Sequence, residues 1–386
     1  MSTTVVLKGA RVLDPMEGLD QTLDVAIEDG VIRQLGAKLP LEGAQVRDCA
    51  GLIVTPGLID GHVHVYEDVG FTGIDPDVLG VNAGVTTVVD AGSAGASSFA
   101  GLRRYVMSRA TTNVLAFLYI ATNKLGMGPH EYGSPRAIDE AVIERVVEQN
   151  RDKILGLKLR AQVWHGDPAQ HPLRRARAIA EHLDLPLMVH IGHRPEDGEG
   201  EAASIRDVVR ILRPGDIVTH LFTSHPGGLL DANGHLQPDV REAYAAGLRF
   251  DLGHGLYNMS FDTAARVLDQ GIEPHSVSTD GHKMAHQHLV YDLPTTMAKM
   301  LSLGFSLADV VRKSTYETAH SLRRPELVPG IAVGRPALLS VLRLAEEEWQ
   351  AEDSTGAKRA AAQRLVPVLT VRGSELHEAQ AVELPV

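Results

Sequence analysis

The pattern of hydrophobic and polar positions divides the chain into three parts, and the first is rich in strands. Segments of aliphatic and β-branched residues at Val5–Leu13 and Leu23–Ile32 predict strands, and Glu28-Asp29-Gly30 predicts a hairpin turn between Ile27 and Val31. From about residue 56 the rhythm changes. Short apolar runs then alternate with longer polar segments of helical character, which is typical of repeated βα units around a parallel sheet.

Eight apolar runs follow one another in this central part. They are Leu58–Val65, Thr86–Gly92, Val114–Ala121, Ile154–Ala161, Pro186–Gly192, Asp216–Phe222, Leu248–His254 and His275–Gly281. Intervening stretches such as Ala137–Gln149 and Arg174–Leu183 carry Arg, Glu and Ala at helical spacing. Eight βα repeats over roughly 270 residues predict an α/β fold, a closed (β/α)8 TIM barrel.

The strand pattern returns after Gly330. Three segments indicate strands: Ala337–Leu344, Leu365–Arg372 and Ala381–Leu384. The polar stretch Ala345–Arg364 between the first two predicts a mobile or helical excursion. Because both ends of the chain share this pattern, we expect a small β-sandwich domain from residues 1–56 and 330–386, beside a barrel of residues 57–329.

Composition narrows the class of protein. The 386 residues are 44% hydrophobic and 22% charged, which is ordinary for a globular protein. The net charge of −12 and the lack of a Lys/Arg cluster argue against nucleic-acid binding. Cys49 is the single cysteine and fits a reducing compartment. With no apolar run of membrane-spanning length and no signal-peptide pattern, we expect a cytoplasmic protein that avoids membranes, either a monomer or a homo-oligomer.

Histidines stand at the ends of several apolar runs. His62 and His64 are two residues apart, so on a strand both side chains point to one face. His190 and His220 end the fifth and sixth runs in the same way. Each histidine alone is compatible with an ordinary core residue. Together they would gather at the carboxyl ends of parallel strands, where neutral imidazoles bind zinc, iron or nickel.

Lys158 and Asp280 complete this set. Lys158 lies in the apolar run Ile154–Ala161, where burial favours the neutral, nucleophilic amine. Such an amine can take up carbon dioxide and become a carbamate able to bridge two metals; alternatively, it reaches the barrel mouth or pairs with an acid. Asp280 ends the eighth run. One carboxylate oxygen could bind a metal while the other moves a proton, although a turn residue is the simpler interpretation.

These residues carry a family resemblance. The order His-x-His, Lys, His, His, Asp resembles the amidohydrolase superfamily of metal-dependent hydrolases in its binuclear form, and Pro56–His64 is similar to its first-strand signature. Three further runs are most similar to a dihydroorotase-like branch that includes deacetylases. They are Leu157-Lys-Leu-Arg160, Phe250-Asp-Leu-Gly-His-Gly255 and Ser278-Thr-Asp-Gly-His282.

The resemblance implies a metal arrangement. A carboxylated Lys158 would bridge two divalent ions, most commonly Zn²⁺. His62, His64 and Asp280 would hold one ion, and His190 and His220 the other. One departure is Pro336-Ala-Leu-Leu339, which stands where the family commonly has Asp-Ala-Asp-Leu. It affects a turn of the β domain and none of the six ligand positions.

This set predicts hydrolysis of an amide or ester by a hydroxide that bridges the two metals, with Asp280 relaying the proton. We expect deacylation of an acylated amino or hydroxy acid. Arg160, two residues beyond Lys158, would bind a substrate carboxylate, unless it forms a rim salt bridge. His254 and His282 are further candidates for substrate binding, or equally for supporting the metal ligands from behind, and the glycine-containing loop Asn123–Gly133 is a candidate cover for the site.

Two alternatives remain from the sequence. A cyclic amidase of the dihydroorotase or hydantoinase type would share the same metal ligands. A non-catalytic scaffold with the same fold is the alternative of another class, since fold does not determine function. All six ligand positions are filled in this chain, which favours an enzyme.

Overall fold

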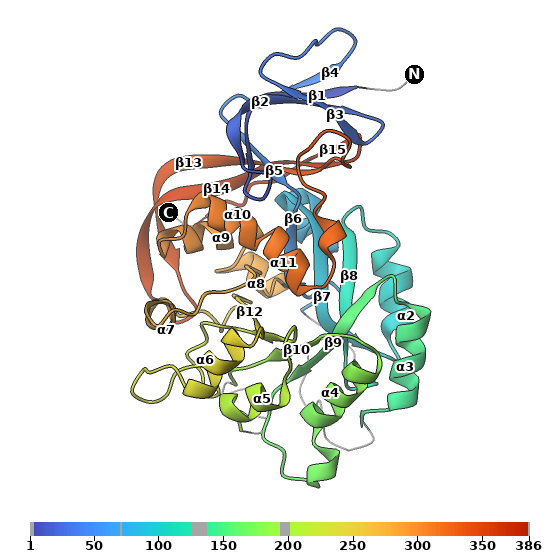
Figure 1. Ribbon diagram of the computed structural model, residues 1–386, viewed down its shortest axis with the longest axis vertical. Coiled ribbons are helices and arrows are strands. Elements are labelled where there is room, and N and C mark those ends of the chain that lie inside the picture. Colours follow the sequence, from blue (N-terminus) through green and yellow to red (C-terminus); the bar gives the residue numbers. More distant parts are fainter. Residues whose placement is uncertain (1–3, 70–71, 125–136, 194–200, 385–386) are drawn as a thin grey trace.

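Strands from both ends of the chain form one sheet. The computed structural model describes residues 4–69, 72–124, 137–193 and 201–384. The sheet has the order β15-β14-β13-β5-β1-β2-β3, with β4 paired to β1 (Figure 1). Its strands are β1 (Val5–Asp14), β2 (Leu19–Glu28), β3 (Val31–Gly36), β4 (Gln45–Asp48), β5 (Ile53–Pro56), β13 (Leu338–Glu352), β14 (Lys358–Arg372) and β15 (Glu375–Glu378). The predicted union of the two ends is therefore present as an eight-stranded sheet.

The predicted turn at residues 28–30 is confirmed. β2 and β3 pair antiparallel around it. Asp29 and Gly30 have positive φ angles of 51° and 75°, the backbone form that tight hairpins need and that Asp and Gly tolerate best. The segment predicted as one strand, Leu23–Ile32, is therefore the end of β2, a turn and the start of β3.

The prediction of a mobile or helical excursion at Ala345–Arg364 is wrong. β13 and β14 are fifteen residues each and pair antiparallel from end to end. Ala351 and Ala361 are buried, whereas Glu346–Glu348 are exposed. A strand with one covered face carries polar residues on the other, which explains the misleading polar composition. The third predicted strand is also misplaced, because β15 precedes Ala381–Leu384.

The central part forms a curled parallel sheet with the order β12-β11-β10-β9-β8-β7-β6 (Figure 1). Its strands are β6 (Leu58–Val63), β7 (Val85–Gly95), β8 (Asn113–Tyr119), β9 (Ile154–Arg160), β10 (Leu187–His190), β11 (Ile217–Thr219) and β12 (Arg249–Asp251). Seven predicted runs thus coincide with strands. The eighth run, His275–Gly281, joins both edges through isolated parallel bridges, from Ser276 to Asp251 of β12 and from Gly281 to Val63 of β6.

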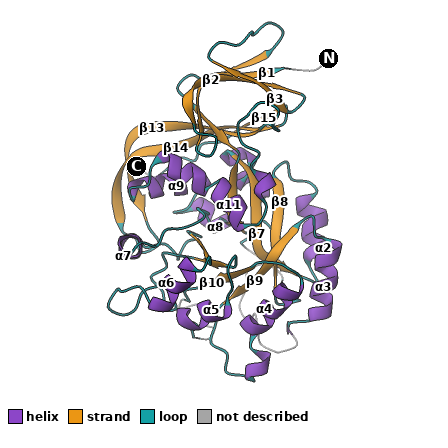
Figure 2. Cartoon of the chain, viewed as in Figure 1, coloured by secondary structure: helices purple, strands orange, loops and turns teal. Residues whose placement is uncertain are grey.

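Helices cover the outside of the parallel sheet (Figure 2). The described α-helices of the chain are α1 (Pro76–Leu79), α2 (Phe99–Gly101), α3 (Glu140–Gln149), α4 (Pro172–His182), α5 (Ile205–Ile211), α6 (Pro238–Ala245), α7 (Phe261–Asp269), α8 (Lys283–Gln287), α9 (Leu293–Ser302), α10 (Leu307–Lys313) and α11 (Tyr316–Ser321). The helices predicted within Ala137–Gln149 and Arg174–Leu183 are confirmed as α3 and α4. None of the described helices has both the length and the apolar composition needed to cross a membrane.

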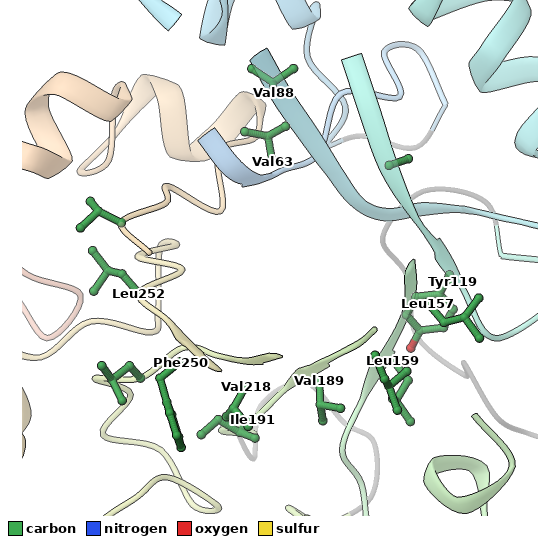
Figure 3. Packing of buried hydrophobic residues seen from close by; sticks show 14 of the residues in the cluster. Val63, Val88, Tyr119, Leu157, Leu159, Val189, Ile191, Val218, Phe250 and Leu252 are labelled. Carbon is green, nitrogen blue, oxygen red and sulfur yellow. The ribbon is translucent and has the colours of Figure 1, made fainter. Parts of the chain in front are cut away.

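Apolar residues pack on both faces of the parallel sheet. Leu157, Leu159 and Val189 belong to the large cluster drawn in Figure 3. Phe117 and Met188 belong to a second cluster. Because neighbouring strand residues point to opposite faces, Met188 lies on the inner face and Val189 on the outer one. The side chain of Lys158 contacts Met188, which places it on the inner face of the curled sheet.

Candidate metal centre

The six predicted ligands lie at the carboxyl ends of the parallel strands, where the residues of barrel active sites are found. They are His62 in β6, His64 directly after it, Lys158 in β9, His190 at the end of β10, His220 directly after β11, and Asp280 in the segment that bridges β6. All six side chains are largely or wholly buried. The structure therefore brings together residues that are up to 218 positions apart, as His62 and Asp280 are.

His62, His64 and Asp280 form a three-residue cluster. The Nε2 atoms of His62 and His64 lie 3.4 Å and 3.2 Å from Oδ1 of Asp280. One ligand atom from each of the three residues lies within 4.8 Å of the others. Oδ1 of Asp280 is buried and has no hydrogen-bond partner among the described residues. This convergence of two imidazoles and a carboxylate is suited to a divalent cation.

Hydroxyl groups hold the outer nitrogens of the two imidazoles. His62 Nδ1 lies 2.9 Å from Oγ1 of Thr219, and that hydroxyl donates to Oδ2 of Asp251 at 2.7 Å. His64 Nδ1 lies 2.8 Å from Oγ of Ser93. Because the Thr219 proton is donated to Asp251, Thr219 accepts from Nδ1–H of His62, which leaves Nε2 of His62 with its lone pair toward Asp280.

Sequence reasoning missed Thr219, Asp251 and Ser93. Thr219 directly precedes His220, and Asp251 lies within the family-like run of residues 250–255. Their places beside the predicted site residues were the only sequence signal of a role in the site. Which side chains pair depends on how neighbouring strands are aligned. Thr219 and Asp251 face each other in the register of β11 and β12.

Lys158 lies beside this cluster. Its Nζ is 3.3 Å from His62 Nε2 and 3.5 Å from Met188 Sδ, and its exposed fraction is 3%. Gly92 makes room for it, because a Cβ at that position would lie 2.8 Å from Cγ of Lys158. The amine is thus placed next to the imidazole of His62, at the inner face of the sheet.

His190 and His220 form a histidine pair. Nε2 of His220 lies 2.7 Å from Nδ1 of His190. The other nitrogens lie against carbonyl oxygens, His220 Nδ1 at 2.6 Å from Gly253 and His190 Nε2 at 3.2 Å from Gly192. A neutral imidazole carries one proton and a carbonyl only accepts, so satisfying both carbonyls leaves two lone pairs facing each other. A cation bound by both nitrogens would remove that conflict.

The electrostatics favour neutral rings at His190 and His220 and an ionised carboxylate at Asp280. Burial lowers the pKa of His220 to about 3, and burial followed by the nearby His220 lowers the pKa of His190 well below its ordinary value. Burial would raise the pKa of Asp280, but His62, His64 and His220 outweigh it and hold that pKa well below its usual range. Neutral imidazoles and ionised carboxylates are the forms that bind metals.

The three residues predicted to contact substrate differ in position. Arg160 ends β9 and lines a cavity of about 40 Å³ together with Lys158, His190 and other residues of the site; Tyr119 and Lys124, which the sequence did not single out, line it too. His282 caps α8, with Nδ1 at 3.4 Å from the backbone nitrogen of Ala285. Most of the loop Asn123–Gly133 lies outside the described residues.

His254 has both ring nitrogens engaged within the protein. Nδ1 lies 2.7 Å from the carbonyl oxygen of Gly255, and Nε2 lies 2.9 Å from Nζ of Lys299. The ring is wholly buried. In this arrangement both ring nitrogens have protein partners, which fits the predicted supporting role, and substrate binding by His254 stays a prediction.

Comparison with known proteins identifies the family and several relatives of this chain. The model of the amidohydrolase family matches residues 53–363. A deacetylase from Agrobacterium fabrum is 34% identical over 85% of this chain and 80% of its own length, and a deacetylase from Brucella anthropi is 32% identical over 88% and 84%. The crystal structure of a dihydroorotase is similar, with a TM-score of 0.86, 31% identity and coverage of 98% of both chains. The family match and the converging ligands agree, and this chain belongs to the amidohydrolase family.

Proposed function

We propose that the protein is a metal-dependent hydrolase that removes the acyl group from an acylated amino or hydroxy acid. The observation that carries the proposal is the cluster of His62, His64 and Asp280, in which a buried carboxylate oxygen with no hydrogen-bond partner in the described part of the chain faces two imidazole nitrogens. Deacetylases about one third identical over most of the chain support the choice of substrate class.

We further propose two Zn²⁺ ions and a carboxylated Lys158 between them. His62, His64 and Asp280 would hold one ion and His190 and His220 the other. Imidazole and carboxylate ligands suit zinc, and the facing nitrogens of the histidine pair support the second position. When bound, the ions would lower the pKa of a water molecule and polarise the scissile carbonyl.

The chain's own residues would orient the substrate and move the proton. Asp280 has its Oδ1 toward the imidazoles, and its Oδ2 lies on the side of Gly255. Oδ2 would accept the proton of the attacking water and deliver it to the leaving amine or alkoxide, which is general base and then general acid catalysis by one carboxylate. Arg160, at the rim of the same cavity, would bind the carboxylate of the substrate.

We also propose a domain architecture and a cellular location for the protein. The segment 275–281 would act as the eighth strand of a closed barrel, because it bridges both edges of the parallel sheet. Residues 57–329 would form this barrel domain, and residues 1–56 with 330–386 the second, sandwich-like domain. The thiol of Cys49 is free and buried, which suits the reducing cytoplasm that we propose as the location.

A cyclic amidase is the second candidate, favoured by the dihydroorotase structure that resembles the chain over 98% of its length. A substrate screen separates the two. Zinc-loaded protein would be tested on N-acetyl amino acids, O-acetyl hydroxy acids, dihydroorotate and hydantoins, each with its methyl ester or amide where the carboxylate can be masked. We expect hydrolysis of the acylated acids and loss of rate when the carboxylate is masked. Turnover of the cyclic compounds alone would select the second candidate.

A further inference from the structure

The carboxylate of Asp280 rests against the backbone of Gly255. A Cβ on Gly255 would lie 2.6 Å from Oδ2 of Asp280, and Gly255 has a positive φ of 54°. The backbone nitrogen of Gly255 donates to the carbonyl of Thr279 at 2.9 Å, and that of His254 donates to Ser278 at 3.1 Å. The place of Oδ2 therefore depends on where the corner formed by His254 and Gly255 lies.

Lys299 holds this corner from one side. This α9 residue is 1% exposed, and its Nζ donates to His254 Nε2 at 2.9 Å and to the carbonyl of Leu289 at 2.7 Å. Because the carbonyl of Gly255 only accepts, the proton of His254 is on Nδ1, and Nε2 is left to accept from Lys299. Burial lowers the pKa of Lys299 to about 7. An amine and an ammonium both carry N–H groups, so the contact persists in either form.

The tip of the β13–β14 hairpin holds the corner from another side. Oγ of Ser354 donates to the carbonyl of Gly255 at 3.3 Å, and the backbone nitrogen of Ser354 donates to Met259 at 2.8 Å. Oδ2 of Asp353 accepts from the backbone nitrogen of Phe261 at 2.6 Å. Figure 1 shows the hairpin running from the terminal sheet to the start of α7, which places this tip over the residues that follow β12.

We propose that Lys299 and the hairpin tip are positioning elements for Asp280, which they serve by fixing the His254–Gly255 corner on which its carboxylate rests. The inference rests on the proposed function, in which Asp280 moves the proton. It gives the terminal sheet a part in turnover, and it explains why a lysine and a histidine are buried together behind the site. In this proposal the two residues act through the position of Asp280 and not by binding the substrate.

A double-mutant cycle tests the proposal, with the best substrate of the screen. Lys299→Met keeps the stem and removes the donor; Lys313→Met is the matched control, since Lys313 is also buried but pairs with Glu273 and Glu317. We expect Lys299→Met to lower kcat about ten- to hundred-fold at nearly unchanged KM, because small misplacements of catalytic groups have effects of this size. Lys313→Met should change kcat by less than about twofold, because the Lys313 side chain is bound to Glu273, Pro274 and Glu317 and not to the His254–Gly255 corner.

The cycle is closed in the Asp280→Asn background. If Lys299 acts through Asp280, Lys299→Met should there change kcat by less than about twofold, because effects through one shared group are not additive. Equal losses in both backgrounds would overturn the proposal and make Lys299 a merely structural residue. Normal turnover of Asp280→Asn alone would instead contradict the proposed function.

A second measurement does not use turnover. Cobalt-substituted protein would be compared by visible absorption, which reports the ligand geometry of the ion. We expect the spectrum to change in Lys299→Met and Ser354→Ala and to stay the same in Lys313→Met at equal metal content. Identical spectra in all four proteins would show that the corner does not position Asp280.

Discussion

The two parts of the candidate metal centre hold their imidazoles in different ways. In the three-residue cluster, the outer nitrogens of His62 and His64 lie on hydroxyl groups, and Asp280 supplies a negative charge. In the histidine pair, the outer nitrogens lie on backbone carbonyls, and the inner nitrogens face each other at 2.7 Å. Among the described residues, the convergent group of His, Cys, Asp and Glu side chains contains the cluster and not the pair.

The cluster and the pair therefore differ in the charge of the side chains that form them. The cluster has its own carboxylate, whereas the pair consists of two neutral rings whose tautomers the carbonyls determine. An ion at the pair would therefore depend on an anionic ligand from elsewhere. In the proposed site this ligand is Lys158 as a carbamate, with its Nζ 3.3 Å from His62 Nε2.

Asp280→Asn removes the charge of the cluster while keeping the shape of the side chain. We expect turnover to fall by about 10²- to 10⁴-fold, the usual contribution of a positioned proton-transfer group. Most of the bound metal should remain, because the four imidazoles are unchanged. Steady-state rates and elemental analysis of the same preparation would check both. A variant with near-normal rates would take the proton-transfer role away from Asp280.

Lys158→Ala should act on the pair more than on the cluster. Without a carbamate, we expect the metal content to fall by about one ion per chain, and turnover with it, because a two-metal site needs its bridging ligand. Short carboxylic acids added to the variant should restore part of both. If the variant keeps its full metal content and rate, Lys158 has only a structural part in the site.

Thr219→Val tests the support of the cluster. Valine keeps the shape of Thr219 but breaks the link from His62 to Asp251. We expect metal affinity or activity to fall about 10- to 100-fold, as for other residues that orient metal-binding histidines. Thr315→Val is a matched control, since Thr315 is also buried and donates to Val311 in the α10–α11 region. Equal effects of the two variants would indicate a loss of general stability instead.

The smallest expected effect is a change in the free energy of unfolding with pH, and it depends on Lys299, which lies outside both parts of the site. Burial lowers the pKa of Lys299 from 10.5 to about 7. Between these values the unfolded chain holds a proton that the folded protein lacks, so the free energy of unfolding should rise with pH, by at most about 1.4 kcal/mol per pH unit. Lys299→Met should lack this rise. Denaturant unfolding from pH 7 to 10 would measure it, and parallel profiles would contradict the buried position of Lys299.

The strand ends that carry the ligands could be predicted from the sequence, because two local rules suffice. Period-two alternation places His62 and His64 on one face, and parallel strands bring His190 and His220 to the same edge. The structure of the segments outside these strands depends on contacts between residues that are far apart in the sequence. Ala345–Arg364 looked like an excursion because its exposed face is polar, and only pairing across the β13–β14 hairpin reveals two strands.

The residues that support the candidate site could not be predicted from the local sequence pattern, for a similar reason. Asp251 and Thr219 are 32 positions apart and meet because β11 and β12 are aligned. Lys299 and His254 are 45 positions apart, and they meet only because α9 brings Lys299 to the residues that follow β12. A lysine within a helix carries no sequence signal of a buried partner. Contacts of this kind depend on the three-dimensional packing of elements.

The central claim is that the cluster and the pair together bind two ions, and the metal content of the protein tests it most directly. Protein purified without chelator, or reconstituted with zinc and bicarbonate, would be analysed for metals per chain. We predict close to two divalent ions, about one of which is lost in a His190→Ala, His220→Ala variant. Protein that binds no divalent ion after reconstitution would contradict the account.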